Sequence, residues 1–153
     1  MGSVESIHIA IAAEAAMRGV AEITAIAGVG LEGDRYASCT GSFSAKPKPG
    51  RQITLIEAEA IEALEHELNL VLAPGDTRRN LVTRGVALNH LVGREFKVGG
   101  VCLRGYELCE PCSDLARMTG KAQILPGLVH RGGLRAEILE GGVIRVGDPV
   151  TFG

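Results

Sequence analysis

Two cysteines in the segment Cys109-Glu110-Pro111-Cys112 are the side chains of this sequence best suited to chemistry. The segment follows an apolar run that reads as a strand. It precedes a predicted helix from Ser113 to Met118, with Ser113 or Cys112 as its cap. Backbone N–H groups at a helix start stabilise a thiolate and lower the pKa of the thiol. A thiolate at Cys112 could therefore attack electrophilic sulfur or bind a soft metal.

Four interpretations of this segment remain open on spacing alone. Structural zinc would need two more ligands, and Cys39 and Cys102 offer no second CxxC pair. The histidines are scattered as well: His8, His66, His90 and His130. A thioredoxin-like dithiol would need a βαβ start, whereas strands surround this motif. Cys109 could instead fill the core while Cys112 caps a helix. The fourth interpretation is one reactive cysteine that carries sulfur or ligates a cofactor metal.

Arginines lie beside glycines or polar residues in three other segments. In Gly30-Leu31-Glu32-Gly33-Asp34-Arg35, backbone N–H groups and Arg35 could hold a phosphate, but a surface Asp34–Arg35 pair at a hairpin or bulge is the simpler interpretation. In a regular strand Arg79 and Asn80 would face opposite sides. Both could line one pocket only if the chain bends at the strand entrance, and otherwise one of them is a wall residue. Arg131 repeats the arginine–glycine theme before a later strand.

Composition and charge exclude several classes of protein. The chain of 153 residues has a formal net charge of −2, which gives no attraction to nucleic acid or anionic membranes. Two Tyr, three Phe and no Trp are too few rings for a platform that stacks single-stranded nucleic acid. No run of about 18 apolar residues predicts a membrane span. We expect a cytoplasmic protein with reduced cysteines, and the sequence leaves its oligomeric state open.

Short strands separated by glycine-rich turns dominate the pattern, and Glu57 to Leu68 is the clearest helix. Hairpins are predicted across Gly99-Gly100 and Gly141-Gly142. Other strands and strand pairs are predicted at Val4 to Ala10, Val20 to Ile26, Gln52 to Ile56, Arg79 to Thr83, Glu95 to Val98 with Val101 to Tyr106, Leu134 to Leu139 with Val143 to Val146, and Val150 to Phe152. Strands follow strands, which favours a mostly β fold over a doubly wound parallel sheet. We therefore predict one domain over residues 1–153, a distorted β-barrel of about eight short strands with a few short helices.

Five segments, in their order along the chain, resemble the MOSC domain. This domain occurs at the C-terminus of molybdenum cofactor sulfurases, in amidoxime-reducing molybdenum enzymes and in short free-standing bacterial proteins. The segments are Gly30 to Tyr36, Arg51 to Ile56, Arg78 to Val82, Pro111 to Leu115 and Gly147 to Val150. The likeness covers about residues 4 to 152 and implies a MOSC-type β-barrel.

The resemblance also implies a set of site residues. Cys112 matches the cysteine of the family's x-Pro-Cys-x-x-Leu pattern, so it is both the predicted catalytic residue and the predicted metal ligand. The predicted cofactor-binding residues are Arg35, Arg51, Arg79 and Asn80. The cofactor implied is the molybdenum cofactor, molybdopterin with its metal, which we expect to be absent from recombinant protein.

The function implied is binding of the molybdenum cofactor, or transport of sulfur as a persulfide for metal–sulfur or cofactor sulfuration, through Cys112. One alternative is a molybdenum-dependent reductase of N-hydroxylated compounds that uses partner electron donors, and another is a non-catalytic partner-binding module. The expected partners are molybdopterin or sulfur donor and acceptor proteins, without nucleic acid or membrane. The sequence lacks the aminotransferase-like domain of full sulfurases, so it is not expected to make a persulfide from cysteine by itself. A second cysteine at position 109 could convert a persulfide on Cys112 into a disulfide.

Overall fold

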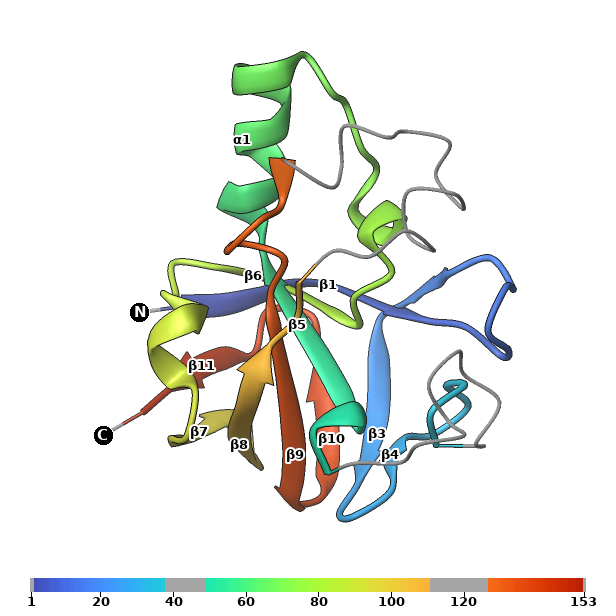
Figure 1. Ribbon diagram of the computed structural model, residues 1–153. Coiled ribbons are helices and arrows are strands. Elements are labelled where there is room, and N and C mark those ends of the chain that lie inside the picture. The colour runs from blue at the N-terminus through green and yellow to red at the C-terminus, as the bar shows by residue number, and fades with distance from the viewer. Residues whose placement is uncertain (1, 38–48, 111–126, 153) are drawn as a thin grey trace.

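The computed structural model describes residues 2–37, 49–110 and 127–152, and it is mostly β (Figure 1). The described strands are β1 (Gly2–Ile9), β2 (Arg18–Val20), β3 (Glu22–Ile26), β4 (Gly30–Leu31), β5 (Ile53–Glu57), β6 (Leu81–Arg84), β7 (Glu95–Val98), β8 (Val101–Leu108), β9 (Leu134–Glu140), β10 (Gly142–Arg145) and β11 (Pro149–Thr151). The helices are α1 (Ala58–Leu68) and the 3-10 helices η1 (Pro49–Arg51), η2 (Pro74–Thr77) and η3 (Leu88–Leu91). No helix in the described part of the chain is long and apolar enough to cross a membrane.

Seven strands close into a barrel. Their order is β1-β11-β7-β8-β9-β5-β6, and β6 pairs back onto β1. The first and last described strands pair directly, since Gly2 lies opposite Val150. β2 adds to the outside of β1, and a second sheet of order β10-β3-β4 stands beside the barrel. The predicted mostly β, distorted barrel is confirmed.

One parallel pair interrupts this otherwise antiparallel barrel of described strands. β5 and β6 run parallel, with Leu55 opposite Leu81 and Ile56 opposite Val82. Parallel neighbours need a crossover connection, and α1 provides it. In Figure 1, α1 rises from one end of the barrel above β5 and β6.

Two apolar clusters follow from the alternation of side chains along these strands. Leu55 and Leu81 point into the barrel core, whereas the next residues, Ile56 and Val82, point outward to α1. The helix covers them with a face that includes Leu64, which has no exposed surface. The helix ends at Asn69, whose left-handed backbone (φ 54°) allows its N–H to reach the carbonyl of Glu65.

A bulge in β1 sets which of its side chains face outward. The register against β6 shifts between Val4 and Ser6, which leaves Glu5 as the extra residue. As a result Val4, Ile7 and Ile9 all contribute to the barrel core. Ser6 and His8 then share the outer face, where the His8 ring contacts the Ser6 hydroxyl.

Most predicted elements are present: the hairpin across Gly99-Gly100 and the helix near Glu57 to Leu68 are confirmed. The prediction of one continuous strand from Val20 to Ile26 is wrong, because the strand is broken at Ala21 into β2 and β3. The predicted pairing of β9 with β10 is wrong, because β10 pairs with β3 and β9 with β5 and β8. Gly141 packs so closely on β3 that an added Cβ would lie 2.5 Å from the carbonyl oxygen of Ala25, so the chain crosses into the second sheet there. The predicted helix from Ser113 to Met118 lies outside the described residues.

Leu64 should be a principal anchor of α1 on the barrel. Replacing Leu64 by Ala should lower the free energy of unfolding by about 2–5 kcal/mol, because it removes buried methyl groups and leaves a cavity. Urea denaturation monitored by circular dichroism measures this loss. Leu68→Ala is the matched control, since Leu68 is 40% exposed and should cost far less. Equal losses in the two variants would contradict the packing described here.

Candidate functional site

A sharp bend between η2 and β6 sends two neighbouring arginines in opposite directions. Arg78 has a left-handed backbone with φ 61°, and its N–H donates to the carbonyl of Gly75. This conformation is uncommon for a residue with a Cβ. The bend separates the side chain of Arg78 from that of Arg79. A bend before the strand was the condition under which Arg79 and Asn80 could line one pocket, but these two side chains bind different segments.

Arg79 is a buried clamp on backbone carbonyls. Its Nε donates to Gly132 O at 2.8 Å, one Nη to Thr77 O at 3.0 Å, and the other Nη to Cys109 O at 2.8 Å and Glu110 O at 3.4 Å. Its side chain thus joins the bend to the end of β8 and to the turn before β9. The clamp therefore fixes Cys109 and Glu110, the two residues that precede Pro111 in the sequence.

Arg78 and Arg35 hold the other side of the same bend. Arg78 donates to Ala15 O at 2.7 Å and to Ala13 O at 2.9 Å, so it organises the loop between β1 and β2. Arg35 donates to Arg78 O at 3.2 Å and lies 3.1 Å from Asp34. The Asp34–Arg35 pair is therefore real, but the prediction that it lies on the surface is wrong, because both residues are buried.

Charges of both signs surround this bend. Among the described residues, Asp34 is the one buried acidic side chain, against the buried Arg35 and Arg79. The half-buried Arg78 lies near the half-buried Asp76 and is influenced by Glu14. Burial, and then the charge of Arg35, lower the pKa of Arg78. Carbonyl dipoles satisfy hydrogen bonds without cancelling a full charge, so an anion would be favoured here.

Asn80 and Arg51 are the other predicted cofactor ligands. The Asn80 side chain joins two strands, because its Oδ1 accepts from Thr54 N at 3.0 Å and its Nδ2 donates to His8 O at 3.1 Å. Arg51 ends η1 and is half-buried. Gly30 packs closely on Gln52, the residue after Arg51, because a Cβ added at Gly30 would lie 3.2 Å from Gln52 O. The Gly30–Arg35 loop therefore lies beside the end of η1. Arg35 and Arg79 thus bind opposite sides of the bend, while Asn80 braces the barrel wall.

The cysteine segment is described as far as Glu110, and Cys112 and Cys39 lie outside the described residues. Cys109 is buried with 3% of its surface exposed, as expected if it fills the core. The Glu110 carboxylate accepts the His130 N–H at 2.8 Å, and Asn89 donates to His130 O at 2.7 Å. Arg131 pairs with Glu67 at the surface, 2.5 Å apart. No cluster of three or more metal-ligating side chains occurs within the described ranges.

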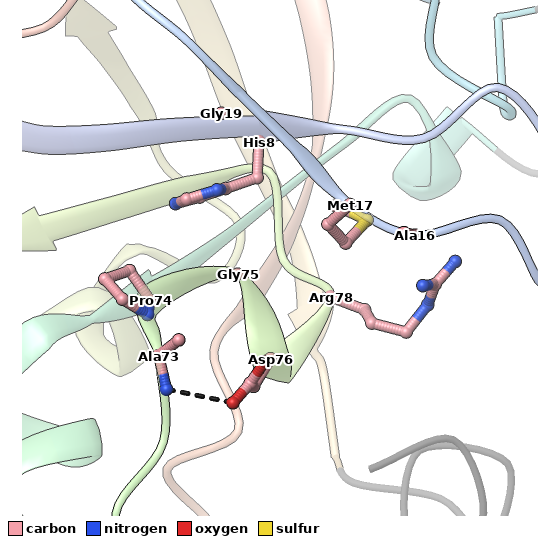
Figure 2. A pocket seen from close by; sticks show the side chains of 9 residues that line it. All are labelled: His8, Ala16, Met17, Gly19, Ala73, Pro74, Gly75, Asp76 and Arg78. Carbon is pink, nitrogen blue, oxygen red and sulfur yellow. Dashed lines mark hydrogen bonds between the residues drawn. The ribbon is translucent and has the colours of Figure 1, made fainter.

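The sequence did not predict that His8 and Arg78 line a common pocket. Figure 2 shows His8 of β1 facing Pro74 and Gly75 of η2, with Asp76 bonded to Ala73 N at 2.9 Å. The cavity has a volume of about 440 Å³. Its lining residues are His8, Ala16, Met17, Gly19, Ala73, Pro74, Gly75, Asp76 and Arg78. The sequence did carry one signal, since a histidine between two isoleucines of a strand must face away from them.

Comparisons with known proteins agree with this architecture. A family model described as the MOSC domain matches residues 42–151. YuaD protein from Bacillus subtilis superposes with a TM-score of 0.81 at 16% identity, covering 98% of this chain and 94% of that one. YiiM from Geobacillus stearothermophilus gives a TM-score of 0.76 at 15% identity over 99% of this chain and 74% of that chain. YiiM from Escherichia coli gives a TM-score of 0.69 at 18% identity, covering 97% of this chain and 68% of that chain. No curated protein matches the sequence.

The Arg79 clamp should contribute strongly to stability. Arg79→Lys should lower the free energy of unfolding by about 2–3 kcal/mol, because one ammonium group cannot serve carbonyls in three segments and leaves buried acceptors unsatisfied. Urea denaturation measures the loss, and amide hydrogen exchange at Cys109 should quicken. Arg131→Lys serves as the control, with a loss under about 1 kcal/mol expected for an exposed pair.

His8 should make the stability depend on pH. Burial lowers the pKa of His8 below 6.5, so the unfolded chain takes up the proton more readily than the folded protein. The stabilising effect is therefore present above pH 6.5 and is lost as the pH falls through the lower pKa of the folded state. The urea midpoint of unfolding should decrease less steeply with falling pH in His8→Asn than in the wild-type protein. The exposed His66→Asn control should keep the wild-type slope.

Proposed function

This chain belongs to the MOSC domain family, which is associated with molybdenum cofactor binding or sulfuration, and on that premise we propose that it holds the molybdenum cofactor or carries sulfur for it through Cys112. The observation that supports the proposal is that two buried arginines, Arg35 and Arg79, flank the bend at Arg78. Asp34 is the one buried carboxylate among the described residues. A pterin phosphate is an anion, and guanidinium groups are suited to bind it.

The charge and the hydrogen-bond donors of the described residues suit an anionic phosphate. Arg35 and Arg79 supply charge that one buried carboxylate, Asp34, offsets only in part. Four hydrogen bonds already occupy most of the five N–H groups of Arg79. Arg79 would therefore act mainly through its charge and by positioning Cys109 and Glu110. Arg35 and Arg51 are assigned to the cofactor by their positions in the segments that resemble the family.

Cys112 is the residue on which both versions of the proposal depend. Bound molybdenum would supply redox or atom-transfer chemistry, and a thiolate is the soft ligand that such a metal favours. A sulfur carrier needs the same thiolate as a nucleophile. The clamp from Arg79 to the carbonyls of Cys109 and Glu110 fixes the two residues that precede Pro111 in the sequence.

Replacing Cys112 by Ala should abolish loading of the protein. The experiment purifies wild-type, Cys112→Ala and Cys102→Ala proteins without oxygen from a host that makes the cofactor, and assays molybdenum, pterin and labile sulfur. Molybdenum with pterin, lost in Cys112→Ala and kept in Cys102→Ala, would identify a cofactor holder. Labile sulfur without metal, lost in the same variant, would identify a carrier.

Equal loading of wild-type and Cys112→Ala proteins would refute the role of Cys112. An absence of all three species from wild-type protein would favour a partner-binding module instead. If molybdenum and pterin are present, turnover of an N-hydroxylated compound with added electron donors would decide whether the protein is a reductase. Cys112→Ala is the control for that assay.

A further inference from the structure

His8 directs one of its two ring nitrogens, Nδ1, toward a pocket. The side chain is nine-tenths buried, with 9% of its surface exposed. Its Nε2 lies 2.9 Å from the Ser6 hydroxyl. Its Nδ1 has no hydrogen-bond partner in the described ranges, although it borders the cavity of about 440 Å³ between β1, β2 and η2. Nδ1 is not among the fully buried atoms without a partner, so it is accessible to water or a ligand in the cavity.

Two glycines keep this nitrogen accessible. A Cβ added at Gly75 would lie 3.1 Å from His8 Nδ1, and one at Gly19 would lie 3.8 Å from it. Figure 2 shows Gly75 between His8 and Asp76 on the pocket wall. Any side chain at position 75 would therefore shield Nδ1 from a molecule in the cavity.

Arg78 is the cationic side chain that lines the pocket. Its two hydrogen bonds to Ala15 and Ala13 leave further N–H groups of the guanidinium for a ligand. Arg35 lies next to Arg78 and is paired with Asp34. The carboxylate of Asp76 also lines the pocket and accepts the Ala73 N–H, so an anion would bind on the Arg78 side.

We infer that this pocket binds a small organic oxoanion, a carboxylate or a phosphate monoester, whose oxygen accepts a hydrogen bond from His8 Nδ1 and whose charge is met by Arg78. When the Ser6 hydroxyl donates to Nε2, the ring hydrogen resides on Nδ1 and points into the cavity. The cavity volume lies in the range of small-molecule sites and exceeds the needs of a single inorganic ion. Met17, Pro74 and Ala16 offer an apolar wall for the organic part.

This site goes beyond the proposed function, because it requires neither Cys112 nor a bound cofactor. Arg35 joins the two regions, since it donates both to Arg78 O and to the thioether of Met17. A molecule in the pocket would therefore lie beside the positively charged bend. Such a position suits a second ligand of a cofactor- or sulfur-handling protein.

Nuclear magnetic resonance of the His8 ring tests the inference on the whole chain without added cofactor. Acetate, succinate, methyl phosphate and inorganic phosphate are titrated separately, with acetamide as the uncharged analogue of acetate. Carboxylates or methyl phosphate should shift the His8 resonances saturably, and acetamide should not. Strong binding of methyl phosphate would select a phosphate monoester, and strong binding of succinate or acetate a carboxylate.

Gly75→Ala separates the site from general effects. It should weaken anion binding about tenfold or more by shielding His8 Nδ1. Gly100→Ala is the matched control, because its added Cβ meets no atom within 4 Å, and binding should not change. Unshifted His8 resonances, equal binding of acetamide and acetate, inorganic phosphate binding alone, or wild-type affinity in a folded Gly75→Ala protein would each overturn the inference. Molybdenum, pterin and sulfur loading should be unchanged in Gly75→Ala, so the two proposals can fail independently.

Discussion

Arginine side chains that are satisfied by backbone carbonyls hold together the ends of several loops in this protein. At the bend formed by Thr77, Arg78 and Arg79, guanidinium groups reach the loop after β1, the end of β8 and the turn before β9. A carboxylate partner would neutralise each charge, whereas a carbonyl leaves it largely intact. The same contacts therefore fix the loops and keep the region positive. The contacts that make these loops rigid are thus the same contacts that leave charge for the proposed anion.

The barrel supplies the positions that these contacts need. The parallel β5–β6 pair forces a long crossover, and the crossover returns to the barrel through η2 and the bend. The bulge at Glu5 keeps the core side chains of β1 inward while it turns Ser6 and His8 toward η2. A regular strand could not place Val4 and Ile7 on the same face. Two local irregularities thus bring residues distant in sequence to one end of the barrel.

The sequence predicts the elements better than their partners. Alternation along β8 and the apolar face of Glu57 to Leu68 are local patterns, and both elements are present. The assignment of β10 to a second sheet depends on close packing of Gly141 against Ala25, which no local pattern reveals. Arg35 and Arg79 were recognisable as residues of interest, but their acceptors are carbonyl groups, which every residue has. The positions of Arg78 and His8 depend on a left-handed backbone and a bulge, which local patterns do not reveal. Only the place of His8 between two isoleucines indicates that its side chain faces outward.

The pairing of β1 with β11 has a consequence for how the chain reaches its native state. Gly2 and Val150 are neighbours in the sheet although almost the entire chain separates them. Closing so large a loop is entropically unfavourable, and contacts of this kind slow folding. During synthesis β1 would emerge first and would lack one of its two barrel neighbours until residues 149–151 had left the ribosome. The backbone groups of Gly2 and Ser3 would be exposed for that interval, and an unpaired strand edge can pair with other chains.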